Sequence, residues 1–309
     1  MRGRDLLTIA DLTSDEISTL LDSAQAQKAD PRGDHGTSLA GRSVALVFEK
    51  PSLRTRVSFE RAVQRLGGDP IYLSPPEVGM GEREPAKDVA RVLSRYCDAI
   101  VCRTFGQDVL QELARYADVP VINALSDWEH PCQALADLLT IREHSSEQGG
   151  PAGRTIAYVG DGNNVIRSLA LAATSEGMHV RIASPDGHVL DSPTVGDATR
   201  RAAASNGSIT LLTDPSDAVR GADFVYTDVW TSMGQEAEAN IRREEFGSYQ
   251  VTVDLVAQAA SGGKIMHDLP AHRGEEITDE AIESDAAIVF DQAENRLHAQ
   301  QAMLWHLLR

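Results

Sequence analysis

Residues 155–164 have the sequence Thr-Ile-Ala-Tyr-Val-Gly-Asp-Gly-Asn-Asn, and this stretch gives the clearest indication of the fold. Its first five residues form an apolar run of strand length, and residues 164–176 continue as a helical pattern. Glycines between a strand and a helix are typical of units in which parallel strands alternate with crossover helices. The turn lacks the third glycine of the dinucleotide-binding fingerprint, and no acidic residue ends the next strand. Asn163 and Asn164 would therefore hold a polar ligand such as an α-carboxylate, or they would simply form the turn.

The same alternation continues on both sides of this stretch. Apolar runs predict further strands, at 43–48, 71–73, 99–101, 119–122, 179–183, 209–212 and 224–227, with less clear runs at 251–255 and 264–267. Periodic patterns predict helices, from Thr13 or Ser14 onward and at 56–66, 85–96, 107–116, 134–141 and 294–309. Residues 144–153 are rich in glycine and lack periodicity, so they are the best linker candidate. We therefore predict an α/β protein of two doubly wound, parallel-sheet (Rossmann-like) domains joined by helices.

Composition and charge exclude several classes of function. The 309 residues suffice for about two domains, and 42% of them are hydrophobic, so each domain can bury a core. The 46 acidic and 29 basic residues leave a net charge of −17, which repels nucleic acid and anionic lipid. The chain has no apolar run near the ~20 residues of a membrane span and no signal segment. Its three cysteines suit a reducing compartment. We expect a soluble, cytoplasmic protein without nucleic-acid or membrane partners.

The basic residues are four lysines and 25 arginines. A saline cytoplasm would explain an acidic, lysine-poor surface, because salt screens the repulsion between like charges. A GC-rich genome would explain the arginines without any salt. The composition fits both explanations.

A phosphate-binding pattern follows the predicted strand at 43–48. Ser52-Leu53-Arg54-Thr55-Arg56 places two hydroxyls and two guanidiniums beside the first amides of a helix. Helix N-terminal N–H groups and arginines together bind a phosphate dianion well. The alternative is an ordinary capped helix with solvated arginines, and this segment alone fits either.

A second polar segment, His130-Pro131-Cys132-Gln133, opens a later predicted helix. His130 would donate a hydrogen bond to a carbonyl oxygen, and Gln133 would bind an amide. The alternative for His130 is a structural histidine with all its hydrogen bonds satisfied. Cys132 has no base nearby in the sequence, so we expect it to pack rather than to react.

Two further segments follow strands of the second half. Residues 228–234 would direct one carboxylate and one hydroxyl forward from a strand exit, or form only a turn. Residues 267–276 contain two histidines, an aspartate and two glutamates, which raises the question of a metal. Because no second ligand cluster occurs at metal spacing, we expect no metal site.

Together and in this order, these segments resemble the aspartate/ornithine carbamoyltransferase family, and most closely its ornithine branch. The likeness extends from about Leu6 to Arg309 and rests on all segments being collinear. The segments are Phe48-Glu49-Lys50-Pro51-Ser52-x-Arg54-Thr55-Arg56, Arg103-Thr104-Phe105, His130-Pro131-Cys132-Gln133-x-Leu135-Ala136-Asp137-Leu138, Asp228-x-Trp230-x-Ser232-Met233-Gly234, His267-x-Leu269-Pro270-Ala271-His272-Arg273-Gly274 and Glu294-Asn295-Arg296-Leu297-His298-Ala299-Gln300.

The resemblance implies how the chain is organised and what it binds. Residues 1–142 with 290–309 would form a carbamoyl-phosphate-binding domain, and residues 143–289 an amino-acid (ornithine)-binding domain. Carbamoyl phosphate and L-ornithine would be the substrates, without metal or organic cofactor. The resemblance also implies a homotrimer, or a multiple of trimers, with sites at the subunit interfaces.

The resemblance also implies roles for single residues, which would hold the phosphate, polarise the carbamoyl carbonyl and bind the two ends of the amino acid. The implied catalytic residues are Arg54, Thr55, Arg103, His130, Asp228 and Asp268. The residues implied to touch the substrates are Ser52, Leu53, Arg54, Thr55, Gly79, Arg103, His130, Gln133, Asn163, Asn164, Asp228, Ser232, Met233, Asp268, Leu269 and Arg296.

Three of these positions depart from the family's usual residues. Leu53 replaces a threonine or serine, and Gly79 replaces a phosphate-contacting glutamine, for which Arg83 is the nearby substitute. Asp268 replaces the cysteine that normally lies beside the attacking amine. Asp268 would lie close to Asp228, and one of two neighbouring carboxylates then has a raised pKa. We hypothesise that Asp268 is a general base or selects a different amine.

The resemblance implies that the carbamoyl group of carbamoyl phosphate passes to the side-chain amine of L-ornithine, giving L-citrulline and phosphate in arginine metabolism. Aspartate is disfavoured by the loop at 232–234 and by Cys132. The first alternative is a carbamoyltransferase for another amine, such as lysine or putrescine. The second is a non-catalytic relative that binds a small molecule or a partner. The reaction would run in either the biosynthetic or the catabolic direction.

Overall fold

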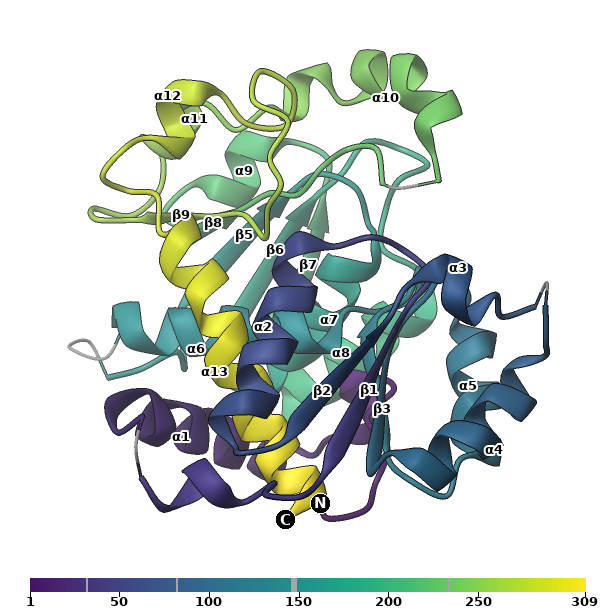
Figure 1. Ribbon diagram of the computed structural model, residues 1–309. Coiled ribbons are helices and arrows are strands. Elements are labelled where there is room, and N and C mark those ends of the chain that lie inside the picture. Colours follow the sequence, from purple (N-terminus) through teal and green to yellow (C-terminus); the bar gives the residue numbers. More distant parts are fainter. Residues whose placement is uncertain (32, 82, 146–148, 233) are drawn as a thin grey trace. The chain divides into compact units, whose positions relative to one another are not determined.

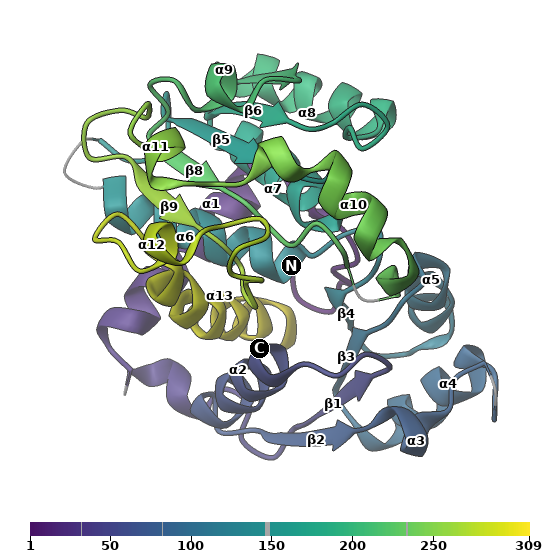
Figure 2. The same ribbon diagram turned by 90° about the horizontal axis from the view of Figure 1, so that it is seen from above.

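The computed structural model describes residues 1–31, 33–81, 83–145, 149–232 and 234–309. The chain forms two compact units, residues 1–139 with 294–309 and residues 140–293. Each unit is a parallel sheet flanked by helices (Figures 1 and 2), so the predicted α/β fold class is confirmed. Within the described ranges, no helix combines the length and apolar character that crossing a bilayer requires.

The first unit is built on a four-stranded sheet in the order β2-β1-β3-β4. Its strands are β1 (Ser43–Phe48), β2 (Asp69–Leu73), β3 (Ala99–Arg103) and β4 (Val121–Leu125). Its helices are α1 (Ser14–Ala29), α2 (Leu53–Arg65), α3 (Pro75–Val78), α4 (Ala86–Tyr96), α5 (Gln107–Tyr116), the start of α6 (Pro131–Ser145) and most of α13 (Val289–Leu308). Short 3-10 turns lie at Ile9–Asp11 and Asp34–Thr37.

The strands of this sheet are apolar because helices cover both faces. All of β3 is buried, whereas β2, at the sheet edge, is partly exposed. Apolar side chains of α4 and α5 pack on the face that carries Val47 and Ile100. Helix α2 lies on the other face (Figures 1 and 2), with Phe59 and Val63 buried.

The second unit contains a five-stranded parallel sheet in the order β7-β6-β5-β8-β9. Its strands are β5 (Thr155–Val159), β6 (His179–Ala183), β7 (Ser208–Leu212), β8 (Phe224–Tyr226) and β9 (Lys264–Met266). Its helices are α7 (Asn164–Ser175), α8 (Ser192–Ser205), α9 (Pro215–Val219), α10 (Ala239–Glu245), α11 (Val253–Val256) and α12 (Asp279–Ile282), with 3-10 turns at Glu236–Glu238 and Gly247–Tyr249. Side chains of α9, α11 and α12 pack on the face that carries Ala157 and Val159, and α7 and α8 lie together on the other face (Figure 1).

In each sheet the strand order reverses beside the first strand. The reversal lies between β1 and β3 in the first unit, where Phe48 is level with Arg103. It lies between β5 and β8 in the second unit, where Tyr158 is level with Tyr226. Ligands of open α/β sheets bind beyond the carboxyl ends of the strands at such a reversal. A ligand site is therefore expected at the loops after these four strands.

Two local predictions are wrong. Residues 251–255 form no strand: Val251 makes a single bridge to Ile277, and the side chain of Thr252 then caps helix α11. Helix α2 begins at Leu53 rather than at residue 56, because the Ser52 hydroxyl caps it three residues earlier. Both errors come from caps, where one hydroxyl moves a helix start by several residues.

Candidate active site

The loop after β1 leads directly into the N-terminus of α2. The Ser52 hydroxyl accepts a hydrogen bond from the Thr55 N–H at 3.3 Å, as an N-cap should. Arg56 points along the surface, over the Tyr72 ring at 3.7 Å, and pairs with Glu60 at 2.9 Å. Arg54 makes no ion pair with any described residue. Of the two arginines in this motif, Arg54 is thus the one available to an anion.

The first unit also contains two buried arginines, Arg296 and Arg103. Thr55 is fully buried, and its hydroxyl oxygen accepts a hydrogen bond from Arg296 Nη2 at 2.5 Å. That bond orients the hydroxyl so that its own proton can be donated elsewhere. Arg103, at the end of β3, is also buried. Two guanidiniums kept out of water provide a strong electrostatic site for negative charge.

His130 lies next to these two guanidiniums and is 1% exposed. Burial lowers the pKa of His130 well below 6.5, and the charges of Arg296 and Arg103 lower it further. The ring is therefore neutral at neutral pH. A neutral imidazole donates a hydrogen bond from one nitrogen without adding a third positive charge.

Gln133 follows His130 on the first turn of α6, and its amide has a fixed orientation. Its Nε2 donates to Asp137 Oδ1 at 2.8 Å. Its Oε1 is buried and has no hydrogen-bond partner among the residues that the structure describes. A buried oxygen without a donor is costly unless a ligand supplies one. Gln133 therefore presents an acceptor to a ligand N–H group.

Cys132 packs, as the sequence predicts. Its thiol contacts the Asn123 carbonyl oxygen at 3.2 Å, and burial raises the pKa of Cys132 to about 12. The thiolate, which is the nucleophilic form, is thus disfavoured.

Gly79 ends the short helix α3 with φ = +56°, a left-handed conformation. A Cβ at this position would lie 2.9 Å from Arg83 Cβ. The backbone therefore favours glycine here, and a longer side chain would be strained. Arg83 donates to the Glu77 carbonyl oxygen at 3.3 Å.

In the second unit, the strand reversal brings Asn163 and Asp228 together. Asn163 caps α7, because its Oδ1 accepts from the N–H groups of Val165 at 3.0 Å and Ile166 at 3.3 Å. Its Nδ2 donates to Asp228 Oδ2 at 2.7 Å. Both ends of this amide are thus used within the protein. Asn164, the first residue of α7, is half-buried beside it.

Asp228 and Asp268 form a close pair of carboxylates with His267. One oxygen of each and Nδ1 of His267 lie within 4.8 Å of one another. Burial raises the pKa of Asp228 well above 3.8, and the neighbouring charge of Asp268 raises it further. The predicted proximity of the two aspartates is confirmed, and the pair holds a proton that solvated aspartates would lose.

His267 is completely buried and makes two well-defined hydrogen bonds. Its Nδ1 accepts from the Leu269 N–H at 2.9 Å, and its Nε2 lies 3.0 Å from Glu276 Oε1. Burial lowers the pKa of His267 and the carboxylates of Asp268 and Glu276 raise it by more, whereas the bond from the Leu269 N–H requires an unprotonated Nδ1. The contact of Nδ1 with Asp268 is longer, at 3.4 Å, so the direct bond from Leu269 decides the arrangement. In this geometry the ring carries its proton on Nε2.

The same bond explains the backbone beside Asp268. Leu269 has φ = +60°, which is rare for a residue with a side chain. Residues held in such conformations cluster at functional sites. The Nδ1 lone pair is occupied by the Leu269 N–H, so the ring offers no lone pair there to a cation. The cluster therefore suits proton exchange with a ligand better than metal binding.

Arg242 of α10 holds Trp230, in the loop after β8. Arg242 donates to the Trp230 carbonyl oxygen and to Asp161 Oδ2, each at 2.9 Å. The Ser232 N–H donates to Gln235 Oε1 at 3.1 Å. Arg242 thus ties this loop to the turn after β5. Met233, which the sequence places in the site, lies outside the described residues.

Two family models match this chain. Residues 4–143 match the model described as aspartate/ornithine carbamoyltransferase, carbamoyl-P binding domain, and residues 152–307 match aspartate/ornithine carbamoyltransferase, Asp/Orn binding domain. The chain belongs to the aspartate/ornithine carbamoyltransferase family. The resemblance inferred from the sequence motifs is confirmed.

Full-length members of the family are similar to this chain. An ornithine carbamoyltransferase from Acidothermus cellulolyticus is 52% identical over 306 residues, which cover 99% of this chain and 96% of that protein. One from Pyrococcus horikoshii is 50% identical over 309 residues, covering 100% and 96%. The solved structure of ornithine carbamoyltransferase from Pyrococcus furiosus has a TM-score of 0.94 and 49% identity, covering 99% and 97% of the two chains.

Two buried acids contact candidate site residues but are not among the site residues that the sequence predicts. Asp137 orients Gln133, and their spacing of four residues on a helix is a signal that the sequence contains. Glu276 bonds to His267 and to the His272 N–H at 2.6 Å. It lies in a loop nine residues after His267, where no periodicity predicts contact.

Proposed function

We propose that this protein transfers the carbamoyl group of carbamoyl phosphate to the side-chain amine of L-ornithine, giving L-citrulline and phosphate. The observation that carries the proposal is the match, over its whole length and at about 50% identity, to relatives named ornithine carbamoyltransferase. One relative, from Pyrococcus furiosus, is named as anabolic, which favours the biosynthetic direction.

We assign carbamoyl phosphate to the domain of residues 1–142 with 290–309. The model for a carbamoyl-P binding domain at residues 4–143 supports this assignment. The phosphate would be bound by the N-terminus of α2, with Ser52, Arg54 and Thr55 as its ligands. The absence of an ion pair at Arg54 and the half-exposed position of Ser52 support this, since a dianion needs accessible donors. At Leu53, only the backbone N–H can contribute.

The carbonyl oxygen of the carbamoyl group would be polarised by Arg103, His130 and Thr55, with Arg296 behind Thr55. Negative charge grows on this oxygen as the amine attacks, and a fixed donor to such an oxygen is typically worth about 3 kcal/mol. The neutral state of His130 supports a donor role, and the buried acceptor of Gln133 would bind the carbamoyl NH₂ group.

We assign the amino acid to residues 143–289, which the match of an Asp/Orn binding domain at residues 152–307 supports. The α-carboxylate would meet Asn163 or Asn164, and the amide of Asn163 also caps α7 and holds Asp228. Asp228, Asp268 and the loop with Ser232 would surround the amine, with Leu269 beside them. Gly79, which replaces a phosphate-contacting glutamine, would offer only its backbone atoms to the phosphate.

Asp268 would take the proton of the attacking amine. The amine nitrogen bonds to the carbamoyl carbon, the bond from that carbon to the phosphate oxygen breaks, and phosphate leaves with the electron pair. A lysine-like ammonium has a reference pKa of about 10.4, so it must lose a proton before attack. The raised pKa of Asp228 makes this residue keep its proton to a higher pH than a solvated aspartate would, which supports Asp268 as the member of the pair that accepts one.

The experiment is phosphate release from carbamoyl phosphate with ornithine, lysine, putrescine or aspartate, at low and high potassium chloride. We expect kcat/KM with ornithine to exceed the others by at least tenfold, or about 1.4 kcal/mol of transition-state discrimination. If kcat/KM is highest with another amine, that amine replaces ornithine in the proposal. Asp268 is the residue that most favours this alternative. Binding of carbamoyl phosphate in a calorimeter, without turnover on any amine, would establish a non-catalytic relative.

The variant Asp268→Cys, measured in the same assay, tests the role of the proton acceptor. We expect a changed pH dependence of kcat, because a thiol titrates several units above a carboxyl group. The control is Asp254→Asn, an exposed aspartate of α11. Unchanged turnover, pH profile and amine preference in Asp268→Cys would remove Asp268 from the mechanism.

We further propose a homotrimer, or a multiple of trimers, in the cytoplasm. Exposed apolar side chains on α2 and at the β2 edge, Leu53, Val57 and Ile71, support burial against another copy. Three buried cysteines that form no disulfide support a reducing compartment.

A further inference from the structure

A hollow of about 410 Å³ lies at the edge of the first sheet that is opposite the site described above. Arg42 precedes β1, Asp98 precedes β3, and Val119 and Pro120 precede β4, so the hollow borders the amino ends of these strands. Its lining includes the guanidiniums of Arg2, Arg42 and Arg95. No part of the proposed function uses these residues.

The guanidinium groups of Arg2 and Arg95 are not neutralised by a carboxylate partner among the described residues. Arg2 and Arg95 make no ion pair with any described residue. Arg91, on the same helix as Arg95, by contrast pairs with Asp88 at 3.2 Å and lies over the Tyr116 ring at 4.8 Å. Two arginines without such a partner in one hollow leave their charges available to a ligand.

The other groups in the hollow leave this positive charge in place. Asp98 is its single acidic lining residue, and its carboxylate accepts from the Ser43 N–H at 2.9 Å. Three guanidiniums and one carboxylate give 3 − 1 = +2 charges. Arg42 is fixed by its hydrogen bond to the Leu308 carbonyl oxygen. Burial and the charge of Asp98 raise the pKa of Cys97, so its thiol adds no anion.

We propose that this hollow binds an anion with a pyrophosphate group. Guanidiniums pair with phosphate oxygens through two parallel N–H bonds, which makes arginine the residue of choice for such groups. The volume lies within the range of small-molecule sites, about 300–1,000 Å³. Tyr96, whose side chain is 72% exposed, lines the hollow and offers its ring to a base. The pyrophosphate group would come from free pyrophosphate or from a nucleoside diphosphate.

This site is separate from the carbamoyl-phosphate site. Asp98 and Arg103 stand at opposite ends of β3, five residues apart, which corresponds to about 17 Å of extended strand. An anion in the hollow would contact the N-terminal segment, α4 and the end of α13, and none of the residues that we assign to catalysis.

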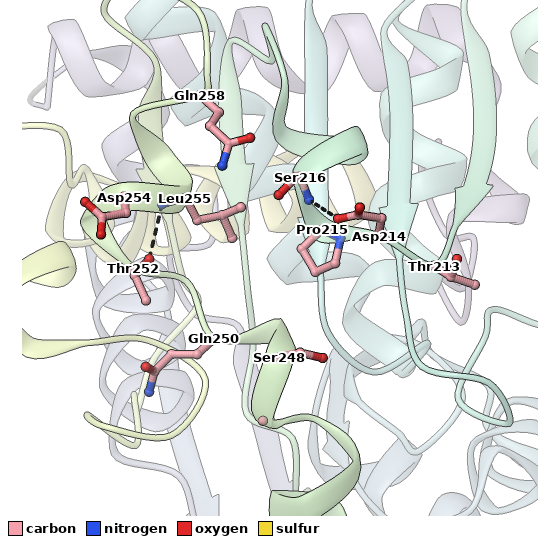
Figure 3. Close-up of a pocket in the computed structure, with 11 residues that line it drawn as sticks. Thr213, Asp214, Pro215, Ser216, Ser248, Gln250, Thr252, Asp254, Leu255 and Gln258 are labelled. Carbon is pink, nitrogen blue, oxygen red and sulfur yellow. Dashed lines mark hydrogen bonds between the residues drawn. The ribbon is translucent and has the colours of Figure 1, made fainter.

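A second hollow, of about 610 Å³, lies in the second unit and lacks the positively charged lining of the first (Figure 3). Its charged lining residues are Asp214 and Asp254, which repel an anion. Asp214 Oδ1 accepts from the Ser216 N–H, and Thr252 Oγ1 accepts from the Leu255 N–H, so both helix starts there are already capped (Figure 3). The arginine-lined hollow is therefore the better candidate for a phosphate ligand.

The test is calorimetric titration of the full chain with inorganic pyrophosphate and with ADP. All proteins carry Arg54→Gln, so that binding at the carbamoyl-phosphate site is suppressed. We expect about one pyrophosphate per chain, and a loss of at least tenfold in affinity when Arg2→Gln and Arg95→Gln are added. The matched control is Arg91→Gln, which removes the same charge from α4 outside the hollow and should bind as the parent does.

The two ligands distinguish the sources of the group. Tighter binding of ADP than of pyrophosphate, lost in Tyr96→Ala, would identify a nucleoside diphosphate. Equal binding would identify the pyrophosphate group alone. The proposal is overturned if the Arg54→Gln protein binds neither ligand, or if the Arg2→Gln, Arg95→Gln protein melts normally and binds as well as the Arg91→Gln control.

Discussion

Asp228 carries a proton at a pH where a solvated aspartate is ionised. Burial is the main cause, and the charge of Asp268 adds to it. The hydrogen bond from Asn163 to Asp228 at 2.7 Å lowers the pKa in the opposite direction, but it does not offset the burial. The folded protein thus keeps a strained pair of acids where the proposed reaction needs a proton acceptor.

This strain predicts a pH-dependent gain in stability from Asp228→Asn. A raised pKa means that the folded state binds a proton that the unfolded state has lost, so the stability contributed by Asp228 is complete below pH 3.8 and falls as pH rises. Asparagine is neutral and has no such loss. We expect the variant to gain at least about 1 kcal/mol on the parent between pH 5 and pH 8, since each unit of pH is worth up to about 1.4 kcal/mol. Denaturant unfolding at both pH values measures it.

The control is Asp217→Asn, which changes an exposed ion pair with Arg220 and should give the same small difference at both pH values. A difference for Asp228→Asn that does not grow with pH would mean that Asp228 is ionised in the folded protein. Turnover should be lost in Asp228→Asn and retained in Asp217→Asn.

At the scale of elements, α7 depends on one side chain that also serves the site. Asn163 caps this helix and holds Asp228 with the other end of its amide. The two tasks are coupled, because the cap fixes the amide and the amide then positions the carboxylate. The position of Asp228 therefore depends on the same side chain that stabilises the start of helix α7.

Two substitutions separate these tasks. Asn163→Ala loses both, and should cost about 1–2 kcal/mol of stability together with most of kcat. Asn163→Ser keeps a capping oxygen but loses the donor to Asp228, so it should recover stability and not kcat. The readouts are denaturant unfolding and ornithine-dependent phosphate release.

Asp214→Ala serves as the control for a cap without a catalytic neighbour, since Asp214 caps α9. It should lose stability while turnover stays unchanged. Full recovery of kcat in Asn163→Ser would show that the bond to Asp228 has no catalytic consequence.

At the scale of the whole molecule, the exposed apolar side chains of α2 and β2 predict assembly. A trimer of 33.4 kDa chains has a mass of 3 × 33.4 = 100.2 kDa, which light scattering after gel filtration measures directly. Val57, 47% exposed on α2, would lie in the interface, so Val57→Asp should shift the mass toward the monomer. Ile241→Asp, on α10, changes a residue that is 59% exposed and should leave the mass unchanged. A parent protein of monomer mass would refute the assembly.

The fold class and most strands follow from local patterns in the sequence. Strands β1, β5 and β6 have the predicted bounds, because buried parallel strands are continuous apolar runs bounded by turns. The start of α2 and the segment at 251–255 do not, because one capping hydroxyl outweighs the pattern around it. Gly79 adopts a positive φ, a conformation for which glycine is the usual residue.

The sequence predicts the two-sheet α/β architecture, the family and the residues of its motifs, because periodicity and collinear motifs are local and ordered along the chain. It also indicated that Asp268 and Asp228 would meet. The tertiary structure fixed the orientation and the contacts of the site side chains. It turned Gln133 toward Asp137, committed Asn163 to a cap, placed Glu276 against His267 and left Arg2 and Arg95 in one hollow without an ion pair to a described residue. The energies of these contacts depend on burial and on distances between charges, which no local pattern encodes.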